Sequence, residues 1–334
     1  MLAAVCVALM PGGCATRQPS SSQPQRTLVW PPPPEQPRIE FVRTISKRED
    51  LGLSASRMRR AFDWLIGSSP TDPFLVNPFG VAFDENDNLC VTDTGANAVC
   101  FFDRKQKRWS RWTKIGNTRF SSPVGVAKRN GRIFVADSGL RAVLVLSESG
   151  ALVSAITDHL QRPVAVVVAG ERLFVVDAER HCVVAFDQQG KFLDEFGKRG
   201  GGNGEFNYPT HIGADAQGKL LVTDSMNNRV QVFDSTGKFL NSFGSAGDAV
   251  GHFGRPKGVA VDSFEHVYVV DGLYDTVQMF NEAGQLLMNF GVAGSDIGEF
   301  WLANGVAISR ANEIFVADAY NHRLQVFKYV GGQQ

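Results

Sequence analysis

Short apolar runs alternate with turn-forming residues along most of the chain, and these runs recur at a regular spacing. An aspartate ends a β-branched or aromatic run six times, about every 45 residues. These aspartates are Asp93, Asp137, Asp177, Asp224, Asp271 and Asp318. A large apolar residue follows each of them by nine positions, and a proline precedes five of them by fourteen or fifteen. The chain therefore contains six copies of one unit.

The fourth copy shows most clearly what one unit contains. Between Phe206 and Gly244 it holds four apolar segments, separated by turn residues at 215–218, 225–228 and 234–237. Four short strands in a unit of this length are typical of a β-propeller blade, whereas a β-helix repeats on a shorter period. We therefore expect an all-β, six-bladed β-propeller. It should span residues 74–329, with residues 330–334 as a tail.

The repeated motifs resemble those of the NHL-repeat family of six-bladed propellers. The matching elements are a Gly-x-Phe-x-x-Pro opening, a Val-Ala-Asp strand end and an Asn-x-Arg-Val-Gln-Val-Phe strand. The sixth copy matches well at residues 298–300, 316–318 and 321–327, and the first three copies are more degenerate. The resemblance implies the same ring fold as in that family.

The sixth copy lacks its outermost strand, because its apolar pattern stops at residues 328–329. Residues 38–46 have the pattern of the missing strand, with Phe41, Val42 and Ile45 as its apolar positions. We expect this segment to complete the last blade, to bury these three side chains and to close the ring. An open sheet edge would otherwise favour aggregation.

Residues 47–73 connect this strand to the first blade. Met58, Phe62 and Ile66 fall at helical spacing, with charged residues on the other side. The pattern predicts one short amphipathic helix that docks on the propeller. A helix that binds a partner or a membrane surface is the alternative.

The N-terminal residues have the composition of an export signal. Residues 1–13 form an apolar run that ends in Pro-Gly-Gly, and Cys14 follows directly. This arrangement resembles the signal peptide of a bacterial lipoprotein, with Cys14 as the lipidated residue. Residues 14–37 are rich in Ser, Gln and Pro and have the composition of an extended tether. The resemblance implies a cell-envelope lipoprotein at the outer membrane, facing the periplasm and touching the membrane through its lipid only. A frayed terminus with a chance cysteine is the alternative.

Charge and composition exclude some classes of function. Lys and Arg number 34, as do Asp and Glu, so we expect no nucleic-acid partner that binds through bulk positive charge. The sequence has no run of eighteen apolar residues that would span a bilayer. Cys90 and Cys100 flank a predicted hairpin turn, and they either form a disulfide or, like Cys182, stay as buried thiols.

The loops before the first strand and after the second strand of each blade share one face around the axis. At the position after the opening proline stand Phe79, Val124, Val164, Thr210, Lys257 and Asn304. The next position holds Gly or Ala in five copies, which relieves crowding near the axis, but it holds His211 in the fourth. We expect Thr210, His211, Lys257 and Asn304 to form a polar arc at the axial mouth, opposite an apolar arc. Solvated loop tips without a ligand are the alternative.

A second set of candidates on this face lies four residues after the aspartates and consists of Arg141, His181, Asp275 and His322. The aspartates themselves recur once per blade at a strand end. We expect them to accept hydrogen bonds from the amides of neighbouring loops rather than to bind metal.

The candidate residues favour binding over catalysis. Peptidyl-hydroxyglycine lyases, which are similar six-bladed propellers, carry Pro-His at the opening of several blades, and no opening proline here is followed by His. Blades three and six are opposite each other, so His181 and His322 stand too far apart to share a metal ion. We expect no catalytic residue, metal or cofactor. The predicted function is a non-enzymatic scaffold that binds an envelope protein, peptide or small ligand on its loop face. The alternative is a metal-dependent lyase or hydrolase with an axial site.

Overall fold

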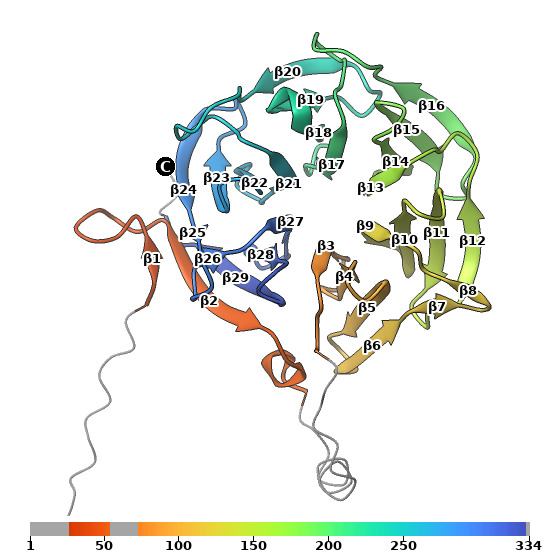
Figure 1. Ribbon diagram of the computed structural model, residues 1–334, viewed down its shortest axis with the longest axis horizontal. Helices are drawn as coiled ribbons and strands as arrows, with labels where there is room; N and C mark the ends of the chain where they lie inside the picture. The colour runs from red at the N-terminus through yellow and green to blue at the C-terminus, as the bar shows by residue number, and fades with distance from the viewer. Residues whose placement is uncertain (1–26, 54–72, 332–334) are drawn as a thin grey trace, which may run out of the picture.

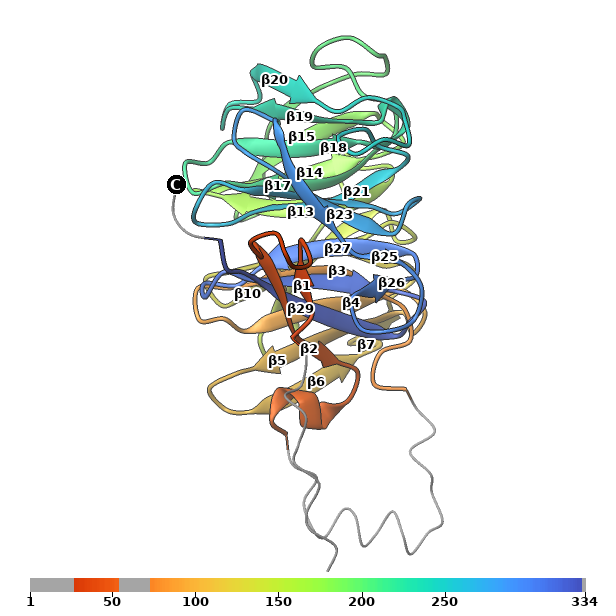
Figure 2. The ribbon, with the colours of Figure 1, turned by 90° about the vertical axis from the view of Figure 1, so that its left-hand side faces the viewer.

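The computed structural model describes residues 27–53 and 73–331, and within them six β-sheets stand around a central axis (Figure 1). Each of the first five sheets is an antiparallel blade of four strands that lie side by side in chain order. The fold is therefore the all-β, six-bladed propeller that the repeats predict. Figure 2 shows the ring from its edge, with the N-terminal strands next to the last strand of the chain.

The first three blades hold the strands from Pro78 to Phe196. Blade 1 contains β3 (Pro78–Phe83), β4 (Leu89–Asp93), β5 (Ala98–Asp103) and β6 (Arg108–Trp112). Blade 2 contains β9 (Pro123–Arg129), β10 (Arg132–Asp137), β11 (Ala142–Ser147) and β12 (Leu152–Ile156). Blade 3 contains β13 (Pro163–Ala169), β14 (Arg172–Asp177), β15 (Cys182–Asp187) and β16 (Phe192–Phe196).

The next three blades complete the ring. Blade 4 contains β17 (Pro209–Ala214), β18 (Leu220–Asp224), β19 (Arg229–Phe233) and β20 (Phe239–Phe243). Blade 5 contains β21 (Pro256–Val261), β22 (Val267–Asp271), β23 (Thr276–Phe280) and β24 (Leu286–Phe290). Blade 6 contains β27 (Ala303–Ile308), β28 (Glu313–Asp318) and β29 (Arg323–Tyr329), joined by β2 (Ile39–Ile45) and β1 (Val29–Trp30).

Short elements decorate the connections between blades. Two-stranded pairs form from β7 (Lys114–Ile115) with β8 (Thr118–Arg119), and from β25 (Val292–Ala293) with β26 (Glu299–Phe300). Among residues 27–53 and 73–331, the helical elements are the 3-10 turns η1 (Arg48–Leu51) and η2 (Ser225–Asn227). No helix in the described ranges has the length or the apolar content to cross a lipid bilayer.

Turns between strands follow from local chemistry, as the β19–β20 hairpin shows. Asp234 Oδ1 accepts hydrogen bonds from the amides of Thr236 and Lys238 at 2.8 and 3.0 Å, which fixes the loop as an Asx-type turn. Gly237 then adopts φ +88°, and a β-carbon there would stand 2.4 Å from the ring of Phe196. Both the backbone and the neighbouring blade therefore require glycine at this position.

The apolar position nine residues after each aspartate lies in the core between neighbouring blades. Its side chains, Phe102, Leu146, Phe186, Phe233, Phe280 and Phe327, are each at most 8% exposed. Burial of such a side chain stabilises the fold by about 1.5–3 kcal/mol. The periodic apolar residues of the sequence are thus the layer that holds adjacent blades together.

The repeated aspartates act as structural ties, as predicted. Asp137, for example, accepts hydrogen bonds from the amides of Ser121, Ser122, Gly139 and Leu140 at 2.8–3.1 Å. These amides belong to the loop before β9 and the loop after β10. The carboxylate is fully buried, so it joins the two loops that form one face of the ring.

The Arg and Gln of the third-strand motif extend this tie. In blade 6, Arg323 Nε donates to Asp318 at 2.7 Å, and Arg323 Nη2 and Gln325 Nε2 donate to the carbonyl of Glu299 at 2.9 and 2.5 Å. Arg229 and Gln231 make the equivalent bonds to Asp224 and Glu205 in blade 4. The motif therefore binds the long loop that enters each of these blades.

The ring closes through β2, which pairs antiparallel with β29 as the outer strand of blade 6. Phe41 is the cross-strand partner of Phe327, just as Phe239 is the partner of Phe233 in blade 4. Ile45 is 1% exposed. Val42 differs from the expectation: a register shift between residues 41 and 43 turns its side chain outward, and it is 39% exposed.

The propeller reaches further toward the N-terminus than the boundary expected at residue 38. Val29 and Trp30 pair with Glu40 and Ile39, so β1 adds a fifth strand to the sheet. The indole of Trp30 packs 5.7 Å from the ring of Phe327, centroid to centroid. The expected signal peptide (residues 1–13), the expected lipidation site Cys14, residues 15–26 of the expected tether and the helix expected around residues 58–66 lie outside the described residues.

Cys90, Cys100 and Cys182 are buried free thiols. Cys90 faces Phe101 across the hairpin and Cys100 faces Val91. Because adjacent positions of a strand point to opposite faces, the two sulfurs lie on opposite faces of blade 1. Burial raises the pKa of the Cys100 and Cys182 thiols to about 12, so they are protonated at neutral pH. The pairing of Cys90 with Cys100 is thus ruled out by strand geometry.

Candidate functional site: the axial cavity

The innermost strands of the six blades meet closely around the axis. A β-carbon on Gly80 would stand 2.5 Å from the carbonyl oxygen of Val124 in the next blade, and one on Gly258 would stand 2.5 Å from that of Asn304. The ring position after the opening residue therefore requires a small side chain where neighbouring blades touch. Blade 4 departs from this rule, because His211 occupies the position.

His211 crosses the axis to the opposite blade. Its imidazole stacks on the ring of Phe79 in blade 1, with centroids 5.7 Å apart and an angle of 15° between the planes. The backbone amide of His211 donates to Thr223 Oγ1 at 2.9 Å, which fixes the residue in β17. The His211–Phe79 pair thus stands in the centre of the ring.

The two ring nitrogens of His211 are buried and have no hydrogen-bond partner in the described structure, although an edge of the residue remains accessible. Burial, together with the nearby charge of Lys257, lowers the pKa of the imidazole to about 3. The ring is therefore neutral at physiological pH and carries one donor and one acceptor. A buried polar group without a partner destabilises the folded state by about 1–3 kcal/mol, so its presence here needs an explanation.

His211 faces a cavity of about 520 Å³ at the axis. Its walls come from the residues on either side of the opening prolines and from the residues after the repeated aspartates. The lining consists of Phe79, Ser122, Val124, Ser138, Arg162, Val164, Ala178, Tyr208, Thr210, His211, Ser225, Met226, Arg255 and Lys257. Five of the six ring positions singled out in the sequence, all except Asn304, are among them.

Lys257 is the half-buried cation of this wall. Its Nζ donates to Asn304 Oδ1 at 2.5 Å, and Asn304, 5% exposed, donates in turn to the carbonyl of Leu302 at 3.0 Å. Burial, reinforced by Arg255, lowers the pKa of Lys257 to about 8. Asn304 thus lies behind the cavity wall and positions the ammonium group that faces it.

The other four predicted candidates lie at the joints between blades rather than in the cavity lining. All of them, Arg141, His181, Asp275 and His322, adopt φ between +48° and +56°. His181 Nδ1 accepts a hydrogen bond from the amide of Tyr208 at 3.1 Å, and Asp275 Oδ1 accepts one from that of Ala303 at 3.2 Å. His322 Nδ1 contacts the carbonyl oxygen of Val76. Arg141 is exposed. Three of these side chains therefore hold the loop that enters the next blade.

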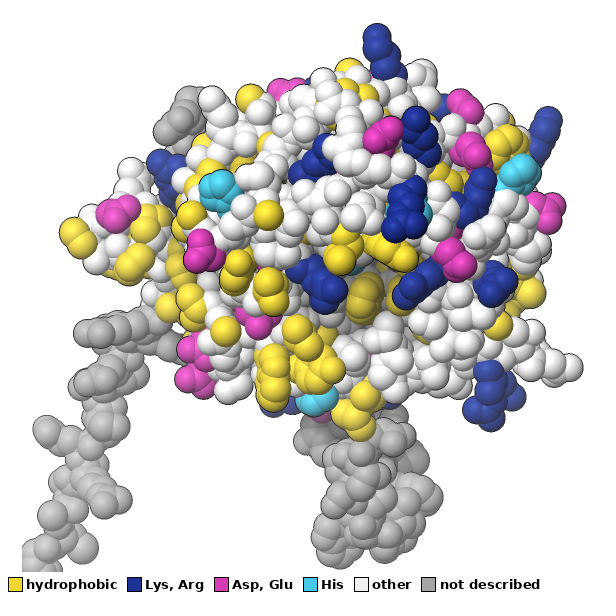
Figure 3. All heavy atoms as spheres, turned by 45° about the horizontal axis from the view of Figure 1, so that its top comes forward, with side chains coloured by type: hydrophobic (Ala, Val, Ile, Leu, Met, Phe, Trp, Pro, Cys, Tyr) yellow, Lys and Arg dark blue, Asp and Glu magenta, His cyan; other side chains and the backbone are white. Residues whose placement is uncertain are grey.

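An exposed apolar arc continues from the cavity over the loops of blades 4 to 6. Two residues after the aspartate, blades 1 to 3 carry Gly95, Gly139 and Glu179, whereas blades 4 to 6 carry Met226, Leu273 and Tyr320. Neighbouring loops add Tyr208, Tyr274, Trp301 and Leu302, and all seven apolar residues are 36–61% exposed. On the face seen in Figure 3, hydrophobic side chains gather next to Lys and Arg side chains around the middle of the ring.

Sequence analysis missed this arc and the cationic rim of the cavity. Arg162 and Arg255 each precede an opening proline, and Met226, Leu273 and Tyr320 share one position of the repeat. The repeat alignment that identified His211 also contains both signals. The arginines stand one residue before the opening proline, and the apolar residues of the arc stand two residues after the aspartate. In contrast, the residues next to His211 in the sequence do not predict that its ring nitrogens lack a hydrogen-bond partner, because this depends on packing across the axis.

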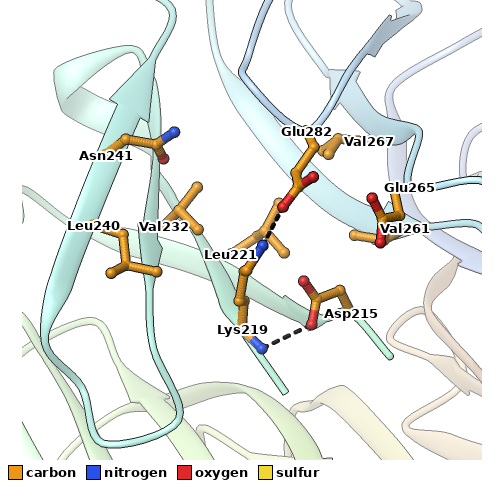
Figure 4. Close-up of a pocket in the computed structure, with 10 residues that line it drawn as sticks. All are labelled: Asp215, Lys219, Leu221, Val232, Leu240, Asn241, Val261, Glu265, Val267 and Glu282. Atoms are coloured by element: carbon orange, nitrogen blue, oxygen red, sulfur yellow. Dashed lines mark hydrogen bonds and ion pairs between the residues drawn. The ribbon is translucent and has the colours of Figure 1, made fainter. Parts of the chain in front are cut away.

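Two other cavities have polar side chains that bond to one another. One cavity of about 200 Å³ lies between blades 4 and 5 (Figure 4). There the ammonium group of Lys219 pairs with Glu282, and the backbone amide of Lys219 donates to Asp215 Oδ1 at 2.8 Å. The second, of about 760 Å³, includes His266, whose Nδ1 bonds to Asp262 Oδ2 at 2.9 Å. Within the described ranges, no three His, Cys, Asp or Glu side chains converge in an arrangement for a metal ion. The axial cavity is therefore the stronger candidate.

Comparison with known proteins agrees with this architecture. A family model of the NHL repeat matches residues 300–327, and one described as a six-bladed β-propeller matches residues 159–218 and 214–273. The chain is a six-bladed β-propeller with an NHL repeat in its sixth blade. No curated protein sequence matches the chain significantly.

Similar solved structures come from proteins of different activity. A streptogramin B lyase is 12% identical with a TM-score of 0.58, and the match covers 76% of this chain and 94% of the lyase. A virginiamycin B lyase from Staphylococcus aureus is 12% identical with a TM-score of 0.56, covering 76% and 96%. A propeller of a nidogen–laminin complex is 17% identical with a TM-score of 0.52, covering 65% and 82%. At these identities the likeness shows the fold alone.

Proposed function

We propose that this NHL-repeat propeller is an envelope-anchored, non-enzymatic binding protein that takes a small ligand or a peptide segment in its axial cavity. The axial cavity of about 520 Å³ carries the proposal, because apolar side chains, the imidazole of His211 and the half-buried ammonium group of Lys257 all belong to its lining. A cavity lined by apolar side chains and a few polar groups is typical of a small-molecule site. A propeller that binds nothing at its axis would be more stable with Gly or Ala in place of His211, and the other five blades have Gly or Ala there.

The apolar arc over blades 4 to 6 supports binding of a larger molecule on the same face. Single exposed apolar residues are ordinary, but a contiguous group next to a cavity is typical of an interaction site. Trp301 and Tyr320 lie with ring centroids 5.7 Å apart and are both about half exposed. Aromatic side chains of this kind supply most of the binding energy in many interfaces.

The test is a pair of matched valine-to-tryptophan variants of the tagged full chain, isolated from its native envelope. Val164→Trp fills the axial cavity, whereas Val153→Trp places the same ring on an exposed position of the outer strand β12. We expect mass spectrometry to find molecules that co-purify with the wild type and the Val153 variant but not with the Val164 variant. The same molecules on all three proteins would contradict the proposal.

The envelope location rests on residues 1–26 of the sequence and has its own test. With Cys14 as the lipidated residue, labelled palmitate should enter the wild-type chain, which should sediment with membranes. Cys14→Ser should abolish both the label and the sedimentation without changing the propeller. A wild-type chain that takes up no lipid and remains in the soluble fraction would contradict this part of the proposal.

A metal-dependent lyase is the second candidate, because two of the similar folds are named as lyases and one related structure is a catalytically inactive virginiamycin B lyase with quinupristin. In this chain His211 is the histidine of the cavity lining. Metal analysis of the purified protein separates the candidates. Stoichiometric metal that is lost in His211→Ala would favour the lyase, and metal-free protein that still binds its ligand would favour the binding protein.

A further inference from the structure

The charges around the axial cavity all have one sign. Arg162 and Arg255 lie exposed at its rim and Lys257 is half-buried in its wall, whereas no Asp or Glu belongs to the lining. The remaining lining is apolar, or neutral and polar. Because the low-dielectric walls of a cavity strengthen the field of its charges, this lining favours a negatively charged ligand over a positively charged one.

Lys257 has no carboxylate partner in the described part of the chain. Its Nζ bonds to the neutral amide of Asn304 at 2.5 Å. The charges of Asp271 and Asp275 influence Lys257 without an ion pair. Asp271 accepts hydrogen bonds from the amides of Gly254 and Arg255, and Asp275 accepts one from the amide of Ala303. A half-buried ammonium without an opposite charge is destabilising by itself, and an anion in the cavity would neutralise it.

The apolar side chains of the lining lie on the other side of the same cavity. Phe79, Val124 and Val164 come from blades 1 to 3, and Lys257 comes from blade 5. His211 stands between these groups, stacked on Phe79 and influenced by the charge of Lys257. A ligand that matches both sides of the cavity therefore needs an apolar body and an anionic group.

We propose that the axial cavity binds a small amphiphilic anion, with its carboxylate or sulfonate group at Lys257 and its apolar body against Phe79, Val124 and Val164. This inference rests on the proposed binding function and specifies its ligand class. Arg162 and Arg255 at the rim attract the anion. A cationic ligand is disfavoured, because it would meet three positive side chains and no carboxylate.

Two probes with the same aromatic body test the charge requirement. 8-Anilinonaphthalene-1-sulfonate carries a sulfonate, and N-phenyl-1-naphthylamine lacks it. We expect the sulfonate probe to bind the wild type at one site per chain and at least tenfold more tightly than the neutral probe, since a charge-assisted hydrogen bond contributes that much. Val164→Trp should abolish the binding of both probes, and Val153→Trp should leave it unchanged.

Lys257→Met is the decisive variant. This substitution should weaken the affinity for the sulfonate probe about tenfold and change the affinity for the neutral probe less than twofold. The affinity of the wild type for the sulfonate probe should fall as pH rises from 8 to 10, whereas the affinity of the variant should not change with pH. Arg255, Asp271, Asp275, His211 and Asn304 are the charged, titratable or hydrogen-bonding groups around Lys257, and all are unchanged in the variant.

The outcomes separate the ligand class from the binding function. Equal affinity of the two probes for the wild type, or an unchanged sulfonate affinity in Lys257→Met, would overturn the anion assignment and leave the binding function standing. If neither probe binds the wild type, both proposals are contradicted.

Discussion

Lys128 is buried in the described part of this propeller and Lys257 is half-buried, and the surroundings of the two lysines differ. Lys128, at the joint of blades 1 and 2, is 5% exposed, pairs with Asp84 and bonds to Glu148 Oε1 at 2.6 Å. Its ammonium also lies 5.3 Å from the centre of the Phe101 ring. Lys257, at the axis, has a neutral amide as its partner. Burial alone would lower the pKa of Lys128, but its two carboxylate partners raise that pKa above its ordinary value. Lys257 has no such partner, and burial lowers its pKa to about 8.

Histidines repeat the same contrast. At the joint of blades 3 and 4, His181 is 6% exposed and accepts the Tyr208 amide, whereas at the axis both nitrogens of His211 lack a partner. Lys128 and His181 at the joints are thus paired within the fold, whereas at the axis Lys257 lacks an opposite charge and both nitrogens of His211 lack a hydrogen-bond partner. This difference agrees with the proposal that the axis serves binding, whereas the joints serve stability.

Removing the joint lysine should have the largest effect. Lys128→Met leaves the buried carboxylate of Asp84 without its cation, which typically destabilises a protein by about 3–5 kcal/mol. The free energy of unfolding in urea measures this loss. A change below about 1 kcal/mol would show that the joint does not depend on the ion pair, and the contrast between the two lysines would disappear.

Substituting the two histidines by phenylalanine should give effects of opposite sign. His211→Phe keeps the stack on Phe79 and removes two unpartnered polar atoms, so it should stabilise the fold by about 1–2 kcal/mol. His181→Phe removes the acceptor of the Tyr208 amide and should destabilise the fold by a similar amount. Thermal unfolding of both variants beside the wild type measures the signs. Destabilisation by both would mean that His211 has a structural partner.

The pH dependence of stability should show the smallest effect. The folded pKa of Lys257, about 8, lies below its ordinary value of 10.5, so the unfolded chain binds the extra proton between these pH values. The free energy of unfolding contributed by Lys257 therefore rises from pH 8 to 10.5. We expect this rise in the free energy of unfolding to be only about 1 kcal/mol, because the side chain of Lys257 keeps some contact with water. The measurement is the difference between the wild type and Lys257→Met, and a difference that is constant with pH would contradict the assignment.

Periodicity made the ring predictable from sequence. The aspartate ties, the buried apolar layer and the position of His211 near the axis all follow from aligned repeats. Val42 was misplaced because a bulge in β2 is set by its pairing with β29 rather than by local pattern. The strand at Val29 was missed because two residues next to a proline run carry too little signal. Whether Lys257 and His211 find partners depends on side chains of other blades, which a single repeat does not encode.

The double variant His211→Phe/Lys257→Met tests most directly whether the axial polar groups serve binding rather than stability. We predict a free energy of unfolding at pH 7.5 that equals or exceeds that of the wild type, together with an affinity for 8-anilinonaphthalene-1-sulfonate at least tenfold weaker. A loss of more than about 2 kcal/mol in stability with unchanged probe affinity would contradict the account.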